Sequence, residues 1–468
     1  MSKDSHPPQP QSLDVLILAA GLGTRMKSRR AKVLHSLGGL PLIAYVCRTA
    51  LALDPHKVYV VVGHQAAEVE AAVREQIDHD VEFVMQQQQR GTADAVLAAR
   101  SQLAESDSLV VILSGDVPLL KTQTLSDFIQ QHRASGAACS ILSVRLENPT
   151  GYGRMVRDSH DRFLRIVEQR DASEEERKIR EVNSGIYCFD SRRLFAALEK
   201  VKPANDQKEF YLTDVAEILL QEGERVNIYL HGDAREVSGI NTRSELAEFE
   251  NLLRRNTVRK LMLEGVTFLD PARAYISANA QIGQDCIIHP DVTIEGATKL
   301  GDECEVRSGT RITNSQIGNN VLIKDHCVII DSIIDANCAV GPFAHLRMNA
   351  TLEEGAVVGN FVEVKKSTLG RGSKSMHLTY LGDATVGKQT NIGAGTVTCN
   401  YDGKDKHRTI IEDNVRIGSD TMLVAPVTVG SGSVTAAGSV VTEDVPRDSL
   451  VAGVPARVKK KLRGNDEV

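Results

Sequence analysis

Between about Leu13 and Val237, short apolar runs alternate with segments whose apolar residues recur at helical spacing. The apolar runs have the length and β-branched content of strands. Strands that alternate with helices predict a parallel sheet with helices on both faces, and ligands of such sheets bind outside the carboxyl ends of the strands. The predicted strands are DVLILAAG (14–21), KVYVVVG (57–63), VEFVMQ (81–86), LVVILSGD (109–116) and ACSILSVRL (138–146), and the predicted helices are 41–53, 66–77 and 92–104.

The segment 241–265 has apolar residues at helical spacing and polar residues between them. Thr242 or Ser244 could cap its start, because either hydroxyl can accept a hydrogen bond from a free N–H of the first turn. We interpret this segment as a helix that connects two domains.

The rest of the chain repeats every six residues. Aliphatic residues occupy 282, 288, 294, 300, 306 and 312 without exception, and the spacing resumes after a slip of one residue at Ile317. A period of six fits neither a helix nor an ordinary alternating strand, and it is typical of hexapeptide repeats stacked as a β-helix. The later aliphatic positions are 323, 329, 334, 340, 346, 352, 358, 364, 386, 392, 411, 417, 423 and 429.

Two details of the repeat affect the chemistry that it can carry. Cys286 and Cys304 are eighteen residues apart, which is three hexads, so they should stack on adjacent coils. Buried free thiols and a disulfide both fit that spacing, and we favour free thiols. The pattern is interrupted between about Lys365 and Asp383, which predicts a loop, and loops on a rigid scaffold often carry function.

Composition narrows the functional class. A chain of 468 residues exceeds one ordinary core, so we expect two or three domains. The net charge of −6 argues against a general nucleic-acid binder. The eight cysteines form no C-x-x-C pair, and no apolar run approaches the length of a membrane span. These features predict a cytoplasmic protein with reduced thiols, no zinc site and no membrane segment.

The stretch LILAAGLGTRMKSRRAKVLH (16–35) joins the first predicted strand to a glycine-rich turn followed by basic residues. Such a turn before a helix presents backbone N–H groups to an anion at the positive end of the helix dipole. By itself it could be only a tight connection. Arg25 and Lys32 could converge on a polyphosphate, and Asp116 follows another strand at the ligand edge, where a carboxylate suits Mg²⁺.

Motifs along the chain then point to one family. LAAGLGTRM, AKVLH, QQQQRGTADA, SGDVPL, PTGYGR, IVEQRDA, VNSGIY, EFYLTD and GINTR occur in the order found in the bacterial bifunctional UDP-N-acetylglucosamine pyrophosphorylase / glucosamine-1-phosphate N-acetyltransferase family. The resemblance covers about residues 13–455. It implies a Rossmann-like nucleotidyltransferase domain (13–240), a linker helix (241–265) and a left-handed parallel β-helix acetyltransferase domain (266–455), between a disordered tail (1–12) and a basic, polar tail (456–468).

The resemblance also implies a uridylyltransferase site. In-line attack of a sugar 1-phosphate oxygen on the α-phosphorus of UTP needs positioning and charge neutralisation more than an acid or base. Arg25 and Lys32 would contact the phosphates, and Asp116 with Asn241 would hold Mg²⁺. Gln86, Gly91 and Thr92 would read the uracil and neighbouring groups, and Gly153, Glu168 and Asn183 would hold the sugar. The remaining implied nucleotide or sugar contacts are Leu18, Ala19, Ala20, Gly21, Ser114 and Gly115.

A second implied site uses acetyl-CoA and glucosamine 1-phosphate. His377 would be the general base that takes a proton from the substrate ammonium, since an imidazole titrates near neutrality. Glu363 could orient it. In the family this site lies between subunits of a trimer, so a homotrimer is implied. Arg347, Lys365, Tyr380 and Asn391 would hold the sugar phosphate, and Ala394, Asn400, Tyr401, Ser419 and Ala437 would line the acetyl-CoA groove.

The chain departs from the family pattern at several positions. Ala31 stands where a proline is usual, and Leu22 where a lysine is common. Asp94 replaces a frequent histidine, and a carboxylate near the nucleotide would repel phosphate unless it points away. Near the end, Gly453 precedes the Val-Pro pair where an arginine is frequent, and Arg457 or Lys459–Lys461 could supply that charge to the coenzyme or belong to a solvated tail.

Three functions therefore remain to be weighed. The first is an enzyme that acetylates glucosamine 1-phosphate and then transfers a uridylyl group to the product, supplying precursors of peptidoglycan and lipopolysaccharide. The second is a single-activity nucleotidyltransferase whose β-helix only regulates or oligomerises. The third is a scaffold that has lost its chemistry. His377 argues against the second, and the set Arg25, Lys32, Asp116 and Asn241 argues against the third.

Overall fold

A computed structural model describes residues 11–462, and these divide between Phe249 and Glu250 into two compact units. The first unit is built around one twisted sheet with the strand order β11-β7-β10-β6-β1-β4-β5. All five predicted strands are present in it. Their bounds are β1 Ser12–Leu18, β4 Lys57–Val62, β5 Val81–Met85, β6 Ser108–Ser114 and β7 Cys139–Arg145, and the others are β10 Glu181–Asp190 and β11 Val226–His231.

Helices cover both faces of this sheet, as the alternation predicts. Along β1, Val15 and Ile17 face one apolar core while Leu16 faces the other, because successive side chains of a strand point to opposite faces. The first core is closed by α1 (Leu42–Leu51), α2 (Ala66–Gln76) and α5 (Thr122–Ser135), and the second by α3 (Thr92–Leu97), α4 (Arg100–Leu103), α6 (Ser191–Leu198) and α7 (Asp214–Gln221).

Three features differ from the sequence prediction. The sheet is not wholly parallel, since β10 runs antiparallel to both β6 and β7 and carries a small hairpin, β8 (Arg154–Arg157) with β9 (Phe163–Val167). The helix predicted over 92–104 is two short helices, α3 and α4. The glycine-rich turn leads into two 3₁₀ turns, η1 (Thr24–Met26) and η2 (Lys32–Leu34), and not into an α-helix.

The connecting helix is α8, Arg243–Leu263. Its start is a capping box, in which the Thr242 hydroxyl accepts the N–H of Glu245 at 3.2 Å and the Glu245 carboxylate accepts the N–H of Thr242 at 2.9 Å. Thr242, and not Ser244, is therefore the capping residue. Toward its end, Val258 and Leu261 pack into the core of the second unit.

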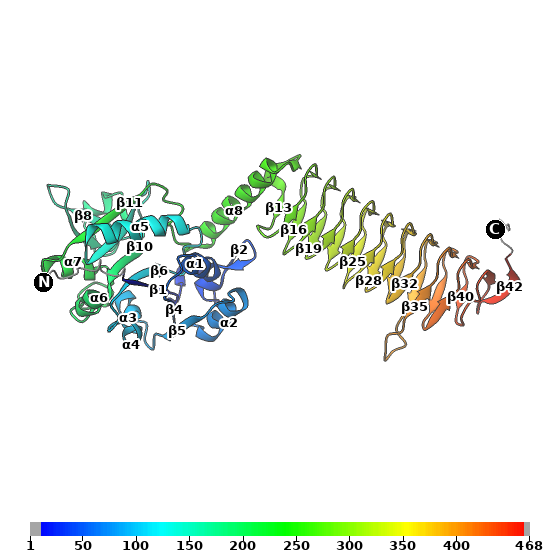
Figure 1. Ribbon diagram of the computed structural model, residues 1–468, viewed down its shortest axis with the longest axis horizontal. Helices are drawn as coiled ribbons and strands as arrows, with labels where there is room; N and C mark the ends of the chain where they lie inside the picture. Colours follow the sequence, from blue (N-terminus) through cyan, green and yellow to red (C-terminus); the bar gives the residue numbers. More distant parts are fainter. Residues whose placement is uncertain (1–10, 463–468) are drawn as a thin grey trace, which may run out of the picture. The chain divides into compact units, whose positions relative to one another are not determined.

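The second unit is a three-sided solenoid whose coils stack into sheets of 12, 10 and 9 strands (Figure 1). The predicted hexad positions pair in register from coil to coil: Ile288, Val306, Ile323 and Val340 follow one another down one sheet. They are buried and form one continuous apolar core. This is the left-handed parallel β-helix that the family resemblance implies.

The loop predicted over 365–383 is wrong. Three strands continue the three sheets through this stretch, namely β29 (Thr368–Leu369), β30 (Lys374–His377) and β31 (Tyr380–Gly382). The inward positions are Leu369, Ser375 and Leu381, all buried. The pattern looked interrupted because a serine takes the place of an aliphatic residue in the second hexad.

The solenoid has its real insertion later, and it ends in an added strand. The chain between β34 (Val397–Cys399) and β35 (Thr409–Ile411) leaves the prism as a loop that projects beside β35 (Figure 1). Within the stretch predicted as a basic tail, Arg457–Lys461 forms the exposed strand β42, antiparallel to β41 (Ser449–Ala452). Of the tail predicted over 1–12, residues 1–10 lie outside the described residues, and Ser12 begins β1.

Candidate functional sites

The carboxyl ends of β1 and β6 meet at a cavity of about 440 Å³ in the first unit. The N–H of Gly115 donates to the carbonyl of Leu18 at 2.9 Å, which joins the two strand ends. Among the residues predicted to bind nucleotide or metal, the cavity wall contains Leu18, Ala19, Ala20, Gly21, Lys32, Gln86, Gly91, Thr92, Ser114 and Asp116, and Leu22 and Glu209 also line it.

The shape of the glycine-rich turn depends on Gly23. Its φ of 60° lies in the left-handed region, and an added Cβ would lie 2.6 Å from the Cβ of Lys32. Lys27 is also left-handed, with φ 47°, so the chain turns back after η1. The anion site predicted here therefore consists of loop N–H groups and side chains, without the dipole of an α-helix.

Arg25, Lys32, Asp116 and Asn241 come together although they are far apart in the sequence. The Lys32 ammonium contacts the carboxylate of Asp116 and lies 3.1 Å from Oδ1 of Asn241, which also accepts a 2.7 Å hydrogen bond from Arg25. Burial acts to raise the pKa of Asp116, but the charge of Lys32 and hydrogen bonds hold it below its ordinary value. Asn241 is held here because its N–H donates to Glu245 of the capping box at 2.6 Å.

Two of these four residues, Asp116 and Asn241, offer oxygens that could hold a divalent cation. Oδ2 of Asp116 and Oδ1 of Asn241 face one point, which the Lys32 ammonium occupies. Hard divalent cations prefer such oxygen ligands, and two protein donors leave positions for phosphate oxygens and water. Residues 11–462 contain no cluster of three or more acidic, histidine or cysteine side chains arranged to hold a metal ion, so any ion here would depend on phosphate oxygens and water for its other ligands.

Gly91 has a structural requirement of its own. Its φ is +121°, and a Cβ there would collide with the backbone of Phe210. The two segments are tied by hydrogen bonds from Phe210 to the carbonyl of Arg90 at 2.8 Å and from Ala93 to the carbonyl of Phe210 at 2.9 Å. The Thr92 hydroxyl accepts the N–H of Leu212 at 2.9 Å, so it also holds this junction.

The charge of Asp94 is compensated inside the protein. Its carboxylate accepts hydrogen bonds from Arg90 at 2.7 Å and from the Gln86 amide at 2.9 Å, and it does not line the cavity. From the sequence alone, the Asp94 carboxylate is expected to repel phosphate unless it points away from the nucleotide. Its negative charge is instead offset by the Arg90 guanidinium.

The predicted sugar contacts form a second group beside β8 and β10. Asn183 donates its N–H to the carbonyl of Gly153 at 2.9 Å, and a Cβ on Gly153 would lie 3.2 Å from Oε1 of Glu168. Burial, followed by the nearby carboxylates of Asp171 and Asp214, raises the pKa of Glu168 to about 7. A carboxyl group that is neutral part of the time at physiological pH can both donate and accept hydrogen bonds.

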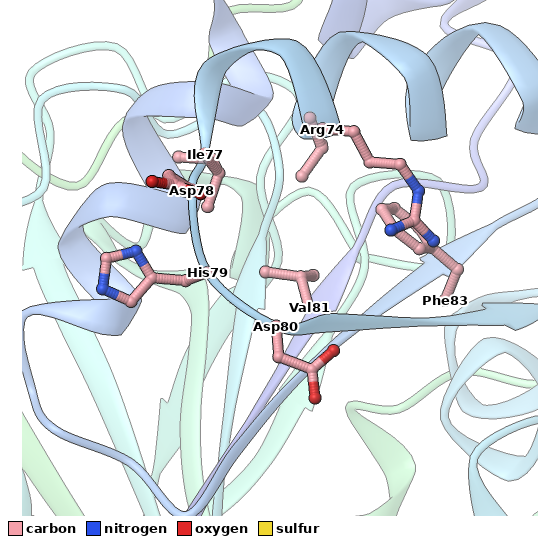
Figure 2. A pocket seen from close by; sticks show the side chains of 8 residues that line it. Arg74, Ile77, Asp78, His79, Asp80, Val81 and Phe83 are labelled. Carbon is pink, nitrogen blue, oxygen red and sulfur yellow. The ribbon is translucent and has the colours of Figure 1, made fainter.

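A different hollow, of about 420 Å³, lies between the end of α2 and the start of β5. Figure 2 shows its lining, in which the Arg74 guanidinium lies over the ring of Phe83, 5.2 Å from the ring centroid. It is at the amino end of β5, opposite the edge where ligands of parallel sheets bind, and it contains none of the predicted site residues.

In the solenoid, residues from five coils line one corner of the prism. His377 pairs in register with Asn360, and both follow an inward-facing residue by two positions. Ala394, Ser419 and Ala437 hold the equivalent position on the next three coils, as the register Ser375–Ile392–Ile417–Thr435 requires. The predicted base and three of the predicted acetyl-CoA residues thus form one row.

His377 is exposed, and its partner differs from the prediction. Nδ1 of His377 lies 2.6 Å from Oδ1 of Asn360. Glu363, expected to orient the imidazole, instead accepts a 2.7 Å hydrogen bond from Arg347. Asn360, and not Glu363, is therefore the residue whose side chain contacts the imidazole of His377. Sequence reasoning missed it because the two residues meet only through the stacking of coils, seventeen positions apart.

Beside this row, three of the four predicted sugar-phosphate residues, Arg347, Lys365 and Tyr380, lie on the neighbouring strands β25 (His345–Arg347), β28 (Glu363–Lys365) and β31. Gly382 leaves space for the Tyr380 ring, because a Cβ there would collide with the Tyr380 hydroxyl. Asn391 is exposed on β33 (Asn391–Ile392), the next strand after β30 in its sheet.

Two further residues join this group without having been predicted. Asp383 lies 3.7 Å from the Lys365 ammonium and accepts a 2.6 Å hydrogen bond from Asn400, so Asn400 helps to hold the lysine. Lys406, from the loop before β35, approaches Lys365, whose charge lowers the pKa of Lys406. Arg347, Lys365 and Lys406 bring three positive charges together, and the carboxylates of Glu363 and Asp383 pair with the first two. Arginine and lysine side chains of this kind can bind a phosphate. Tyr401, predicted to contact the coenzyme, is exposed on the same loop.

Comparisons with known proteins agree with both units. The nucleotidyl transferase family matches residues 14–234, the GMPPB C-terminal domain family matches 271–369, and the bacterial transferase hexapeptide (six repeats) family matches 408–443. The bifunctional protein GlmU of Syntrophomonas wolfei is 46% identical over 438 residues, covering 94% of this chain and 96% of the relative. The protein of the same name from Heliobacterium modesticaldum is 47% identical over 450 residues, covering 96% of each chain.

Proposed function

The chain belongs to the family of the bifunctional protein GlmU, and from this premise we propose that it catalyses two successive transfers. The first moves the acetyl group of acetyl-CoA to the amine of glucosamine 1-phosphate. The second moves the uridylyl group of UTP to the N-acetylglucosamine 1-phosphate formed, and releases pyrophosphate. The observation that carries the proposal is that one chain holds two separate groups of site residues, one on the sheet and one on the solenoid.

For uridylyl transfer, we assign residues 13–240 as the catalytic domain. A phosphate oxygen of the sugar phosphate attacks the α-phosphorus of UTP as the bond to pyrophosphate breaks. Arg25 and Lys32 neutralise the phosphates, and the N–H groups of residues 18–21 position them. The sugar contacts Gly153, Glu168 and Asn183.

Nucleotidyl transfer in this family uses a divalent cation, and we propose Mg²⁺ for this chain, held by Asp116 and Asn241. When bound, the ion neutralises charge on the phosphates. Lys32 must then move off these two oxygens, and we expect its ammonium to contact phosphate instead. A flexible four-carbon side chain can make that change without movement of the backbone.

For acetyl transfer, we assign residues 266–455, joined to the first domain by the linker 241–265. Oδ1 of Asn360 accepts the Nδ1–H of His377, which leaves Nε2 with the lone pair that a base requires. Nε2 takes one proton from the substrate ammonium, and the amine nitrogen attacks the thioester carbon. As the C–S bond breaks, the nitrogen loses a second proton and the sulfur gains one, which leaves the amide and the thiol of CoA. Arg347, Lys365 and Lys406 hold the phosphate, with Tyr380 and Asn391 beside it, and the corner row from Ala394 to Ala437 receives the coenzyme.

We further propose that the chain assembles as a homotrimer through the solenoid. An apolar row lies directly after the corner row on successive coils, with Phe343 48%, Phe361 55% and Leu378 63% exposed. The Phe343 ring stacks on His326 and on Phe361, with centroids 5.2 Å apart in both pairs. A contiguous exposed apolar surface of this kind is typical of a subunit contact. Because Leu378 adjoins His377, the contact would lie beside the acetyltransferase site.

We also propose a cytoplasmic location, which the eight free cysteines support. No helix in residues 11–462 is long and apolar enough to cross a membrane.

Two substitutions test the two-site proposal. His377→Ala should reduce acetyl transfer at least about a hundredfold and leave uridylyl transfer unchanged, because it removes the base from one site only. Asp116→Ala should abolish Mg²⁺-dependent pyrophosphate release and leave acetyl transfer unchanged. Thiol release from acetyl-CoA and pyrophosphate release from UTP, each followed with its own sugar phosphate, measure the two steps. Loss of both activities in either variant would contradict two independent sites.

A further inference from the structure

The ion pair between Arg90 and Asp94 stands next to a residue of the nucleotide cavity without entering it. Asp94 is 9% exposed, and Gln86, which lines the cavity, is 6% exposed. One carboxylate oxygen of Asp94 accepts Nε and Nη2 of Arg90, at 3.1 and 2.7 Å. The other accepts Nε2 of Gln86 at 2.9 Å.

These contacts fix the orientation of the Gln86 side-chain amide, with its NH₂ end toward Asp94 and Gly91. Nε2 of Gln86 also donates to the carbonyl of Gly91 at 3.2 Å, so both amide hydrogens are used. An ionised carboxylate and a carbonyl can only accept hydrogen bonds, so the NH₂ end must face them. Among residues 11–462, no donor contacts the Gln86 amide oxygen, which remains available to a ligand as an acceptor.

We propose that the Arg90–Asp94 pair is a specificity device, which holds the Gln86 amide oxygen toward the cavity and so selects a base that carries an N–H on its pairing edge. The proposal rests on the proposed function, in which the nucleotide is UTP. Uracil has a donor at N3, which the amide oxygen accepts. Cytosine has a lone pair at N3, so its edge would place an acceptor against an acceptor, and a buried polar group left unpaired is costly.

The pair is held from outside the cavity as well. The Arg90 guanidinium lies over the Phe210 ring, 5.6 Å from its centroid, and the backbone hydrogen bonds between the two segments keep the loop in place. Asp94 does not line the cavity and acts through Gln86, so its role in this proposal is that of a positioning residue and not a catalytic one.

Asp94→Asn tests this proposal, because an asparagine side chain can offer either a donor or an acceptor to Gln86. The Gln86 amide group is then free to rotate and exchange the positions of its oxygen and its NH₂ group. We expect the ratio of kcat/KM for UTP to that for CTP, measured on the full-length enzyme by pyrophosphate release, to fall at least about tenfold. The matched control is Glu70→Gln. It breaks a similar pair, Glu70–Arg74, on the surface of α2 and should leave the ratio unchanged.

A double variant separates positioning from a general loss of structure. In Gln86→Ala the ratio should already be low, and adding Asp94→Asn should not lower it further, because the residue through which Asp94 acts is gone. If Asp94→Asn releases no pyrophosphate from either nucleotide, the ratio of the dissociation constants of UTP and CTP replaces the kinetic ratio, and the same fall is expected.

Two outcomes would overturn the proposal: a wild-type enzyme that uses UTP and CTP equally well, or an Asp94→Asn enzyme whose ratio stays within twofold of wild type. Failure of the proposed function itself would appear differently, as a wild-type protein that releases no pyrophosphate from UTP.

Discussion

At the residue scale, the contact between Nδ1 of His377 and Oδ1 of Asn360 bears on the proposed role of His377 as a base, because a nitrogen that donates this hydrogen bond cannot also take a proton. Asn360→Leu removes the acceptor, so the proton can move to Nε2 and the ring can turn. We expect kcat/KM for acetyl transfer to fall about ten- to a hundredfold, as is usual when a partner that orients a functional imidazole is removed. Uridylyl transfer in the same protein is the internal control. An acetyl transfer rate within twofold of wild type would contradict the assignment.

The partly buried carboxyl of Glu168 gives a prediction about pH. The pKa of Glu168 is about 7 in the folded protein, against an ordinary value of 4.5. Between these values the folded state binds more protons than the unfolded state, so the free energy of unfolding falls as the pH rises. Once the pH is above 7, this loss in the free energy of unfolding approaches its full value of about 3 kcal/mol, at 1.36 kcal/mol per unit of pKa shift.

Glu168→Gln removes this cost because glutamine does not ionise. We expect the variant to gain thermal stability over wild type at pH 8 and to gain little at pH 5, measured by scanning calorimetry without substrates. The contrasting variant is Glu248→Gln, at an exposed position of α8, which should leave the difference between the two pH values unchanged. An equal change at both pH values for Glu168→Gln would mean that its carboxyl is not protonated in the folded protein.

At the element scale, the start of α8 links a helix cap to Asn241, one of the two proposed metal ligands. Glu245 accepts the N–H groups of both Asn241 and Thr242. Glu245→Ala should destabilise the protein by about 1 kcal/mol and, by freeing Asn241, lower uridylyl transfer about tenfold. Acetyl transfer should not change. Ser244→Ala, an exposed neighbour outside the capping box, should leave both activities and the unfolding midpoint as they are.

The elements also show how far the sequence could predict the structure. The hexads predicted the core positions of the solenoid, because an aliphatic residue that faces the core recurs about every six positions. Ser375 breaks that pattern, and its buried hydroxyl has no hydrogen-bond partner among residues 11–462, which carries an energetic cost. The coil still forms, and the inward positions on either side of it, Leu369 and Leu381, are aliphatic and buried. Contacts that depend on stacking, such as Asn360 with His377 and Asp383 with Lys365, have no local signature.

The first unit shows the same division. Its strands were predictable from apolar runs, but the antiparallel β10 was not, because strand direction depends on the path of the chain between strands. The motifs placed Lys32, Asp116 and Asn241 at one site. The pairing of Asp94 with Arg90 was not predicted, although the two lie four residues apart, because the local pattern does not show that a carboxylate at this position turns away from the cavity.

At the scale of the whole molecule, the proposed subunit contact through Phe343, Phe361 and Leu378 would affect only one of the two activities. The row adjoins the acetyltransferase residues, whereas the nucleotide cavity belongs entirely to the other unit. A change that prevents assembly should therefore separate the two activities in the way that His377→Ala does, but without touching a site residue.

Phe361→Ser tests this. Removing a half-exposed aromatic side chain from the centre of the row should shift the protein from trimer toward monomer in analytical ultracentrifugation and lower acetyl transfer at least about tenfold, because the contact beside His377 is lost. Uridylyl transfer should stay within twofold of wild type. Ile333→Ser is the matched control, since Ile333 is 45% exposed on the same solenoid but lies outside the row. A Phe361→Ser protein that remains trimeric and fully active would show that the row is not the subunit contact.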